Sequence, residues 1–218
     1  MRTRVAASKA RVVVWLGGAA VPALLLLLWG FWTYRIDRAW TMYRAESLAA
    51  AEIDWTNNPS VDAGIGADVN RLNRETAMKR RWDAKDAARV AGFIRLPPDP
   101  KDRIGRDPKA AARAILQSSA VEVAGVRLKY FRRAEPQIAT VLHAALVEEL
   151  RSTDPHRRSQ AGVLLISLGE HESDNAVRAA IHALESDPDP DVKQAITLNL
   201  QYAREAKARR SRASNPAQ

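Results

Sequence analysis

Two stretches of the chain, LRSTDPHRRSQAGVLLISL (150–168) and LESDPDPDVKQAITLNLQY (184–202), align with each other at an offset of 34 residues. Leucine, serine, glutamine and alanine recur at matching positions, and an Asp-Pro turn recurs within one position. The residues just before them, 145–150 and 179–184, match at the same offset. An internal period of this length is typical of stacked repeat units. The pattern therefore predicts two copies of a unit built from a helix, a tight turn and a second helix.

The turns of the two copies carry residues that begin and end helices. Asp154 and Asp189 stand just before the second helix of each copy, where an aspartate side chain accepts hydrogen bonds from the first free N–H groups. Gly169 follows the apolar run of the first copy, and glycine commonly ends a helix. These positions predict the boundaries of the paired helices.

The stretch SDPDPDVKQA (186–195) resembles the HEAT-repeat family, in particular its short bacterial, lyase-type form. The pattern of that form is a leucine, an Asp-Pro-Asp-like turn, a Val-Arg pair and an alanine. The first copy departs from it, because His156, Arg157 and Arg158 stand where the acid and the valine would be. The resemblance covers residues 135–204 and implies a short right-handed α-solenoid that presents a surface to another protein.

Polar positions outside the apolar stripes of the paired helices are candidates for contact with that partner. An ordinary solvated helix surface is the alternative interpretation of each. The candidates are Glu148, Arg151, Asp174, Arg178, His182 and Glu185.

The N-terminal part contains VVVWLGGAAVPALLLLLWGFWTY (12–34), which has no charged residue. A helix of this length covers a hydrocarbon core of about 30 Å. Aromatic and basic residues flank it, as is typical of membrane interfaces. We therefore expect an uncleaved signal anchor, with these interface residues: Arg11, Trp15, Trp29, Trp32, Tyr34 and Arg35.

A cleaved signal peptide and a mitochondrial presequence are the alternatives to an anchor. The apolar run is longer than that of a signal peptide and leads into bulky residues, and the basic start is short for a presequence. More positive charge precedes the run than follows it, which favours an N terminus inside. In a bacterium this orientation places the anchor in the inner membrane and the C-terminal part in the periplasm.

Between the anchor and the repeats, we expect a helix at 36–55 that continues the span and a second helix at 68–93, the two forming a membrane-proximal helical hairpin. The second helix begins at Asp68 and carries a strongly basic face. The segment LPPDPKDRIGRDP (96–108) has four prolines, which predicts a linker and a domain boundary. The basic face comprises Arg71, Arg74, Lys79, Arg80, Arg81, Lys85 and Arg89.

The expected organisation is therefore all-α. A basic flank (1–11), a transmembrane helix (12–34) and a membrane-proximal helical region (35–95) precede the linker (96–108). A HEAT-like solenoid (109–204) and a disordered basic tail (205–218) follow it. Whether residues 109–134 join the repeat stack is left open by the sequence.

The net charge of +9 is distributed unevenly along the chain. Both ends are basic, residues 71–113 carry thirteen basic against six acidic groups, and residues 135–203 carry five against eleven. The excess positive charge is therefore not a uniform nucleic-acid-binding surface.

No pattern of catalytic residues is present in the sequence. There is no cysteine, and the four histidines, His143, His156, His171 and His182, lack the spacing of a metal site. We therefore expect no enzymatic activity, cofactor or metal. The favoured hypothesis is a membrane-anchored adaptor that binds a protein in a membrane complex. The alternatives are a lyase-like or chaperone-like HEAT protein, and binding of nucleic acid or anionic lipid by the basic helix and tail.

Overall fold

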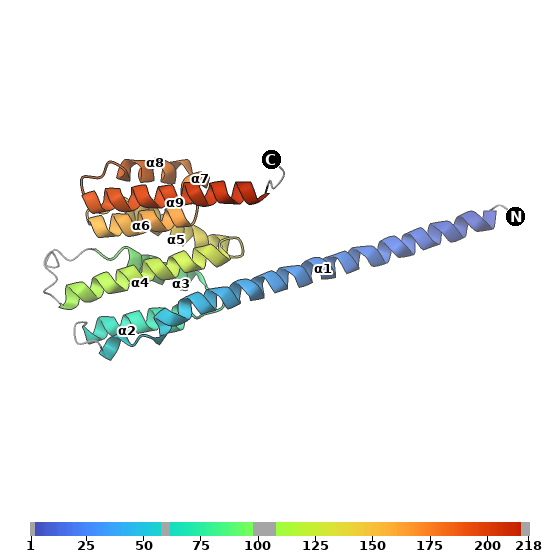
Figure 1. Cartoon of the computed structure of the whole chain (residues 1–218). Helices are drawn as coiled ribbons and strands as arrows, with labels where there is room; N and C mark the ends of the chain where they lie inside the picture. Colours follow the sequence, from blue (N-terminus) through green and yellow to red (C-terminus); the bar gives the residue numbers. More distant parts are fainter. Residues whose placement is uncertain (1–2, 58–61, 98–107, 215–218) are drawn as a thin grey trace. The chain divides into compact units, whose positions relative to one another are not determined.

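The computed structural model describes the backbone of residues 3–57, 62–97 and 108–214, and their side chains except those of 3–23, 49–51, 108–111 and 214. All regular structure in these residues is helical, which confirms the all-α class (Figure 1). The chain divides into two compact units, Met1–Met42 and Tyr43–Gln218. They are called unit 1 and unit 2 below.

Unit 1 consists of the greater part of α1 (Thr3–Glu52), whose last residues belong to unit 2. The side chains of Leu24 to Trp29 are exposed, as are Phe31, Trp32 and Tyr34. Within the described residues, no helix combines the length and the apolar character needed to cross a bilayer. The described set does not include the side chains of Arg11 or of residues 12–23 of the predicted span, and Trp15 is one of the latter.

Unit 2 contains the remaining helices in chain order. The first half comprises η1 (Trp55–Asn57), α2 (Ala63–Arg71), η2 (Leu72–Thr76), α3 (Ala84–Ile94) and α4 (Pro108–Phe131). The second half comprises α5 (Pro136–Glu149), α6 (Pro155–Ser167), α7 (Glu170–Ser173), α8 (Asn175–Leu184) and α9 (Pro190–Ser214). One continuous apolar core runs through both halves, from Val69 in α2 to Leu200 in α9.

The two predicted copies form the helix pairs α5–α6 and α8–α9, and α6 packs closely against α9. A side chain at Gly162 of α6 would meet Ile196 of α9 at 2.5 Å. Asp154 accepts from the N–H of His156 at 2.9 Å, and Asp189 accepts from that of Asp191 at 3.0 Å. Gly169 has φ of 75° directly after α6. The predicted helix starts and the glycine stop are confirmed.

The register of the two copies differs by one residue from the sequence alignment. The capping residues Asp154 and Asp189, and the prolines that follow them, are 35 positions apart. Burial follows the same offset, which pairs Leu142 with Val177 and Leu146 with Ile181. The identical letters at offset 34 therefore do not mark equivalent buried positions throughout the copies.

The helix predicted over 68–93 is interrupted. Asp62, not Asp68, caps α2, and residues 77–83 separate η2 from α3. Asp83 begins α3 with a capping box, because its side chain accepts from the N–H of Asp86 at 3.0 Å while its own N–H donates to the Asp86 side chain at 2.9 Å. The seven basic residues predicted to share one helix face are therefore distributed over four segments, namely α2, η2, residues 77–83 and α3.

Helix α3 packs against α4 and α5, and α4 packs against α6, where Gln160 donates to the hydroxyl of Ser118 at 2.6 Å. Helices on both sides of the proline-rich segment thus share the core of unit 2. The predicted boundary at 96–108, of which 98–107 lies outside the described residues, does not separate two compact units. Residues 112–131 contribute side chains from Leu116 to Leu128 to this common core.

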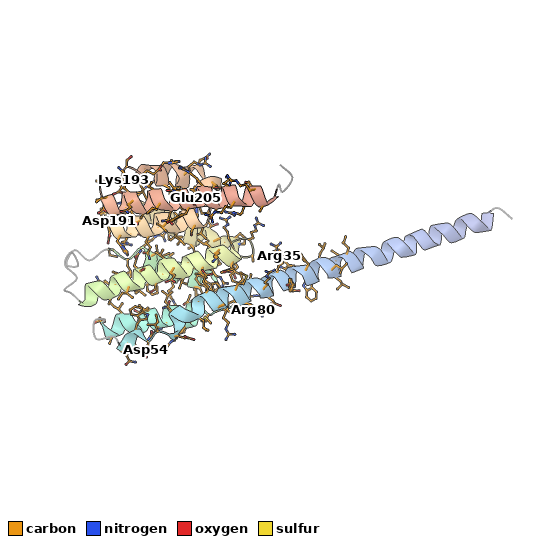
Figure 2. All side chains as sticks on the ribbon, in the orientation of Figure 1. Arg35, Asp54, Arg80, Asp191, Lys193 and Glu205 are labelled. Atoms are coloured by element: carbon orange, nitrogen blue, oxygen red, sulfur yellow. The ribbon has the colours of Figure 1, made fainter. Side chains whose placement is uncertain are left out.

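The C-terminal tail predicted to be disordered is helical up to Ser214, while residues 215–218 lie outside the described set. Alanine, arginine and lysine dominate this segment, and all three have high helix propensity. Glu205 accepts from Gln201 at 3.1 Å and lies 3.7 Å from Arg209, so i,i+4 pairs add support. Figure 2 shows Glu205 well along α9 from Asp191 and Lys193, which lie near its start.

Candidate protein-binding surface

An open groove of about 710 Å³ lies between the two helix pairs of unit 2. One side is formed by the second half of α5 and the turn that follows it, and the other by the start of α8. Apolar side chains line it together with charged ones, and they include Ala144, Val147 and Ala176. Grooves that combine apolar surface with a few polar groups are typical of binding sites.

Three of the six predicted contact residues, Glu148, Arg151 and Asp174, line this groove. Glu148 accepts from Nε of Arg95 at 2.6 Å. Asp174 caps α8 and accepts from the N–H groups of Ala176 at 2.8 Å and Val177 at 3.2 Å. The charges of both acidic residues are therefore already engaged within the protein.

Arg151 differs from these two acids. Its side chain is exposed and makes no hydrogen bond or ion pair within the part of the chain that the structure describes. A free guanidinium presents donors in a planar fork that suits carboxylates on a partner. Arg151 is therefore the charged residue of the groove that is available to a ligand.

Glu149, which also lines the groove, forms a buried ion pair with Arg157, with an Oε2–Nε distance of 2.8 Å. The Arg157 guanidinium also donates to the carbonyl oxygens of Ile94 at 2.6 Å and Leu96 at 2.5 Å, at the end of α3. A cation in this position satisfies carbonyls that a helix end leaves without partners. Burial raises the pKa of Glu149, and the charge of Arg157 opposes that shift.

The other three predicted residues lie outside the groove. Arg178 donates to the carbonyl oxygens of His171 at 2.9 Å and Glu172 at 2.7 Å, so it stabilises the turn between α7 and α8. His182 and Glu185 bind each other at the end of α8. The structure therefore supports only Glu148, Arg151 and Asp174 as members of one surface.

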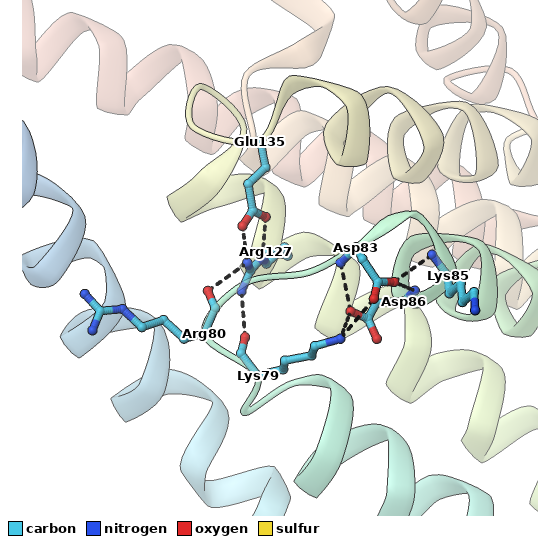
Figure 3. A network of polar contacts seen from close by, with 7 residues as sticks. All are labelled: Lys79, Arg80, Asp83, Lys85, Asp86, Arg127 and Glu135. Carbon is cyan, nitrogen blue, oxygen red and sulfur yellow. Dashed lines mark hydrogen bonds and ion pairs between the residues drawn. The ribbon is translucent and has the colours of Figure 1, made fainter.

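A buried polar centre that the sequence patterns do not reveal lies near the end of α4. Arg127 is 1% exposed and donates to the carbonyl oxygens of Lys79 and Arg80 at 3.1 Å each and to the Glu135 carboxylate (Figure 3). Its guanidinium lies over the Phe131 ring at 4.2 Å and the Trp82 ring at 5.0 Å. This cluster ties the non-helical segment 77–83 to α4, and it is structural.

The predicted interface residues of unit 1 that the structure describes are all exposed. Trp29 is 67%, Trp32 50% and Tyr34 62% exposed, and Arg35 lies 5.6 Å from the Phe31 ring centre. Exposed apolar surface of this extent is unusual on a monomeric soluble protein.

No group of metal-ligating side chains occurs among the residues whose positions are described. His171, which the sequence raised as a possible ligand, is partly buried, and this burial lowers its pKa. Comparison of the chain with protein-family models, with curated proteins and with solved structures gives no match. The geometry described above is therefore the basis for a functional proposal.

Proposed function

We propose that the chain is a membrane-anchored adaptor that binds another protein in the groove between α5 and α8. In this proposal residues 12–34 are the anchor, and the helix pairs of unit 2 form a short HEAT-like solenoid that carries the groove. The orientation with the N terminus inside and unit 2 outside the cytoplasm is part of the same proposal, on the basis of the flanking positive charges.

The groove itself is the observation that carries the proposal. Its apolar lining, at Ala144, Val147 and Ala176, would be removed from water by a partner, and such burial is the main favourable contribution to association. Arg151 supplies an unengaged charge at the rim. Arginine is enriched among the residues that contribute most to binding at interfaces.

The exposed apolar side chains of residues 24–34 support the membrane part of the proposal. Surface of this kind binds either a lipid bilayer or another protein. The tryptophans and Tyr34 near its C-terminal end are residue types that favour the headgroup layer.

Photo-crosslinking in living cells tests the groove. A photoreactive phenylalanine at Ala144 or at Ala176 is expected to give the same discrete adduct with one partner protein. The matched control places the photoreactive residue at Lys193, which is exposed near the start of α9 and does not line the groove.

Arg151→Glu should abolish the adduct from Ala144, because it reverses the free charge at the rim, while Lys193→Glu should leave it unchanged. Identical adducts from Ala144 and Lys193, or an adduct that persists in Arg151→Glu, would contradict binding in the groove.

A further inference from the structure

One end of unit 2 gathers basic residues from several helices. The segments 43–46, 79–81, 129–135, 170–172 and 204–214 hold twelve basic against five acidic residues, and they are called the basic end. Figure 1 shows the C-terminal ends of α4 and α9 on the same side of this unit.

Direct contacts hold these segments together. Lys129 binds Glu46 at 2.8 Å, and Lys207 binds Glu172 at 3.1 Å. Arg132 binds Glu170 in α7. Arg127 binds the carbonyl oxygens of 79 and 80 as described above. The basic end is therefore one built surface, although its residues are far apart in the sequence.

Much of this charge has no partner among the residues that the structure describes. The side chains of five exposed arginines make no hydrogen bond or ion pair with any described residue: Arg44, Arg81, Arg133, Arg204 and Arg212. Tyr202 is 60% exposed just before the last of these segments. Clustered unpaired cations fit a surface that is itself anionic.

The charge is polarised along unit 2. Arg158 joins the segments 148–154 and 185–191, because it donates to the carbonyl oxygen of Ser152 at 2.8 Å and to Asp187 at 2.8 and 2.9 Å. Together these two segments hold seven acidic residues and one basic residue. They lie at the start of α9, whereas the basic end lies at its last turns. A helix of 25 residues is about 37 Å long. Of these two ends of α9, the basic end is therefore the one whose described residues suit an anionic partner.

We propose that the basic end binds the headgroups of anionic phospholipids and so sets which end of unit 2 faces the bilayer. The proposal rests on the membrane anchor of the proposed function. Tyr43 follows Tyr34, the last residue of that anchor, by nine residues, which span about 30 Å at most when fully extended. The basic end, which includes residues 43–46, is therefore always within reach of the membrane surface.

A single label can report this contact because the chain has no cysteine. Ser211 is exposed on α9, and Ser211→Cys allows one fluorophore to be attached. The labelled full chain is placed in nanodiscs of phosphatidylcholine, alone or with an equal amount of phosphatidylglycerol, that contain a headgroup acceptor dye. Energy transfer is expected to be higher in the phosphatidylglycerol discs, and 0.5 M NaCl should remove the difference because it screens the attraction. Equal transfer in both lipids at low salt would overturn the proposal.

Arg204→Gln together with Arg212→Gln should lower the bound-to-free ratio in the anionic discs by about 30-fold, because each cation near such a surface adds to the affinity. Lys193→Gln, near the start of α9, is the matched control and should change nothing. An equal effect of both variants would overturn the assignment to the basic end.

Two further outcomes are informative. Failure of the chain to enter phosphatidylcholine discs would contradict the anchor. Flotation of the full chain with vesicles of the same two compositions then tests the basic end separately. We expect the chain to float with the anionic vesicles in a salt-sensitive manner. Equal flotation with both kinds of vesicle would contradict lipid binding by the basic end. Release of the label from anionic discs by a single-stranded oligonucleotide at equal phosphate concentration would overturn the lipid assignment in favour of nucleic acid.

Discussion

The two copies of the repeated unit place different chemistry at the same pair of buried positions. In the first copy these positions hold Glu149 and Arg157, which form an ion pair, and in the second they hold Leu184 and Val192. The first copy lies against α3, whose last carbonyl oxygens accept from Arg157. The second copy has no such carbonyls to satisfy among the described contacts. The departure of the first copy from the repeat pattern is thus explained by its neighbour.

The largest expected effect comes from removing the arginine of that pair alone. Arg157→Val should destabilise unit 2 by about 3–5 kcal/mol, because it leaves Glu149 buried without its counterion. Urea unfolding followed by circular dichroism measures this change. Arg133→Ala, at an exposed arginine of unit 2, is the control and should stay within about 0.5 kcal/mol.

The double variant Glu149→Leu with Arg157→Val copies the second unit into the first. It should recover most of the lost stability, since a packed apolar pair often replaces a buried ion pair without net cost. A double variant as unstable as Arg157→Val would show instead that the bonds to Ile94 and Leu96 dominate.

The capping aspartates of both copies contribute less to the free energy of unfolding than Arg157 does. Asp154→Ala and Asp189→Ala should each lower the free energy of unfolding by about 1 kcal/mol, because each removes an acceptor from the first turn of a helix. Equilibrium urea unfolding of the two variants compares them directly. A loss in only one variant would contradict the equivalence of the two turns at an offset of 35.

These contrasts explain how much of the fold is visible in the sequence. Asp154, Asp189 and Gly169 act on their own helix ends, so local chemistry was enough to predict them. The start of α3 at Asp83 carries a local capping signal in Asp83 and Asp86, whereas the course of segment 77–83 also depends on Arg127, which reaches it from a helix that is distant in sequence. An arginine between apolar residues gives no sign that it is buried rather than exposed.

The candidate site was predictable only in part, for the same reason. Glu148, Arg151 and Asp174 were recognised as polar positions on predicted helices. Their separation from Arg178, His182 and Glu185 depends on the spacing of α5 and α8, which no local pattern contains. The apolar lining at Val147 was missed because an apolar residue on such a helix is expected to be core.

A dependence on pH should distinguish the ion-paired copy from the apolar one. Burial raises the pKa of Glu149, so the folded state binds this proton more tightly than the unfolded state does. The contribution of Glu149 to the free energy of unfolding is therefore fully present below the pKa of this residue in the unfolded state, about 4.3. It decreases as the pH rises through the pKa of the folded state.

Glu149→Gln removes this titration. The free energy of unfolding of Glu149→Gln minus that of the unmodified chain should therefore rise between pH 4 and pH 7, because only the unmodified chain loses this contribution. Urea unfolding at a series of pH values measures the difference, and a difference that falls over this range would contradict the shift.

Arg151, at the rim between the two copies, should have the smallest effect on stability. Its side chain makes no described interaction, so Arg151→Glu should change the free energy of unfolding by less than about 0.5 kcal/mol. Thermal unfolding checks this. A large loss of stability would mean that Arg151 contributes to the fold rather than to a binding surface.

The decisive measurement is the affinity of unit 2 for the partner captured from the groove, compared between two charge reversals. Arg151 lines the groove, whereas Glu185 lies at the end of α8 and does not. With purified partner and isothermal titration calorimetry, Arg151→Glu should weaken Kd at least about tenfold, because it replaces the unengaged guanidinium of the groove with a charge of opposite sign, and arginine is enriched among the residues that contribute most to binding. Glu185→Lys should leave Kd unchanged. Equal Kd values for Arg151→Glu and the unmodified chain, or a larger loss in Glu185→Lys, would contradict the groove as the binding site.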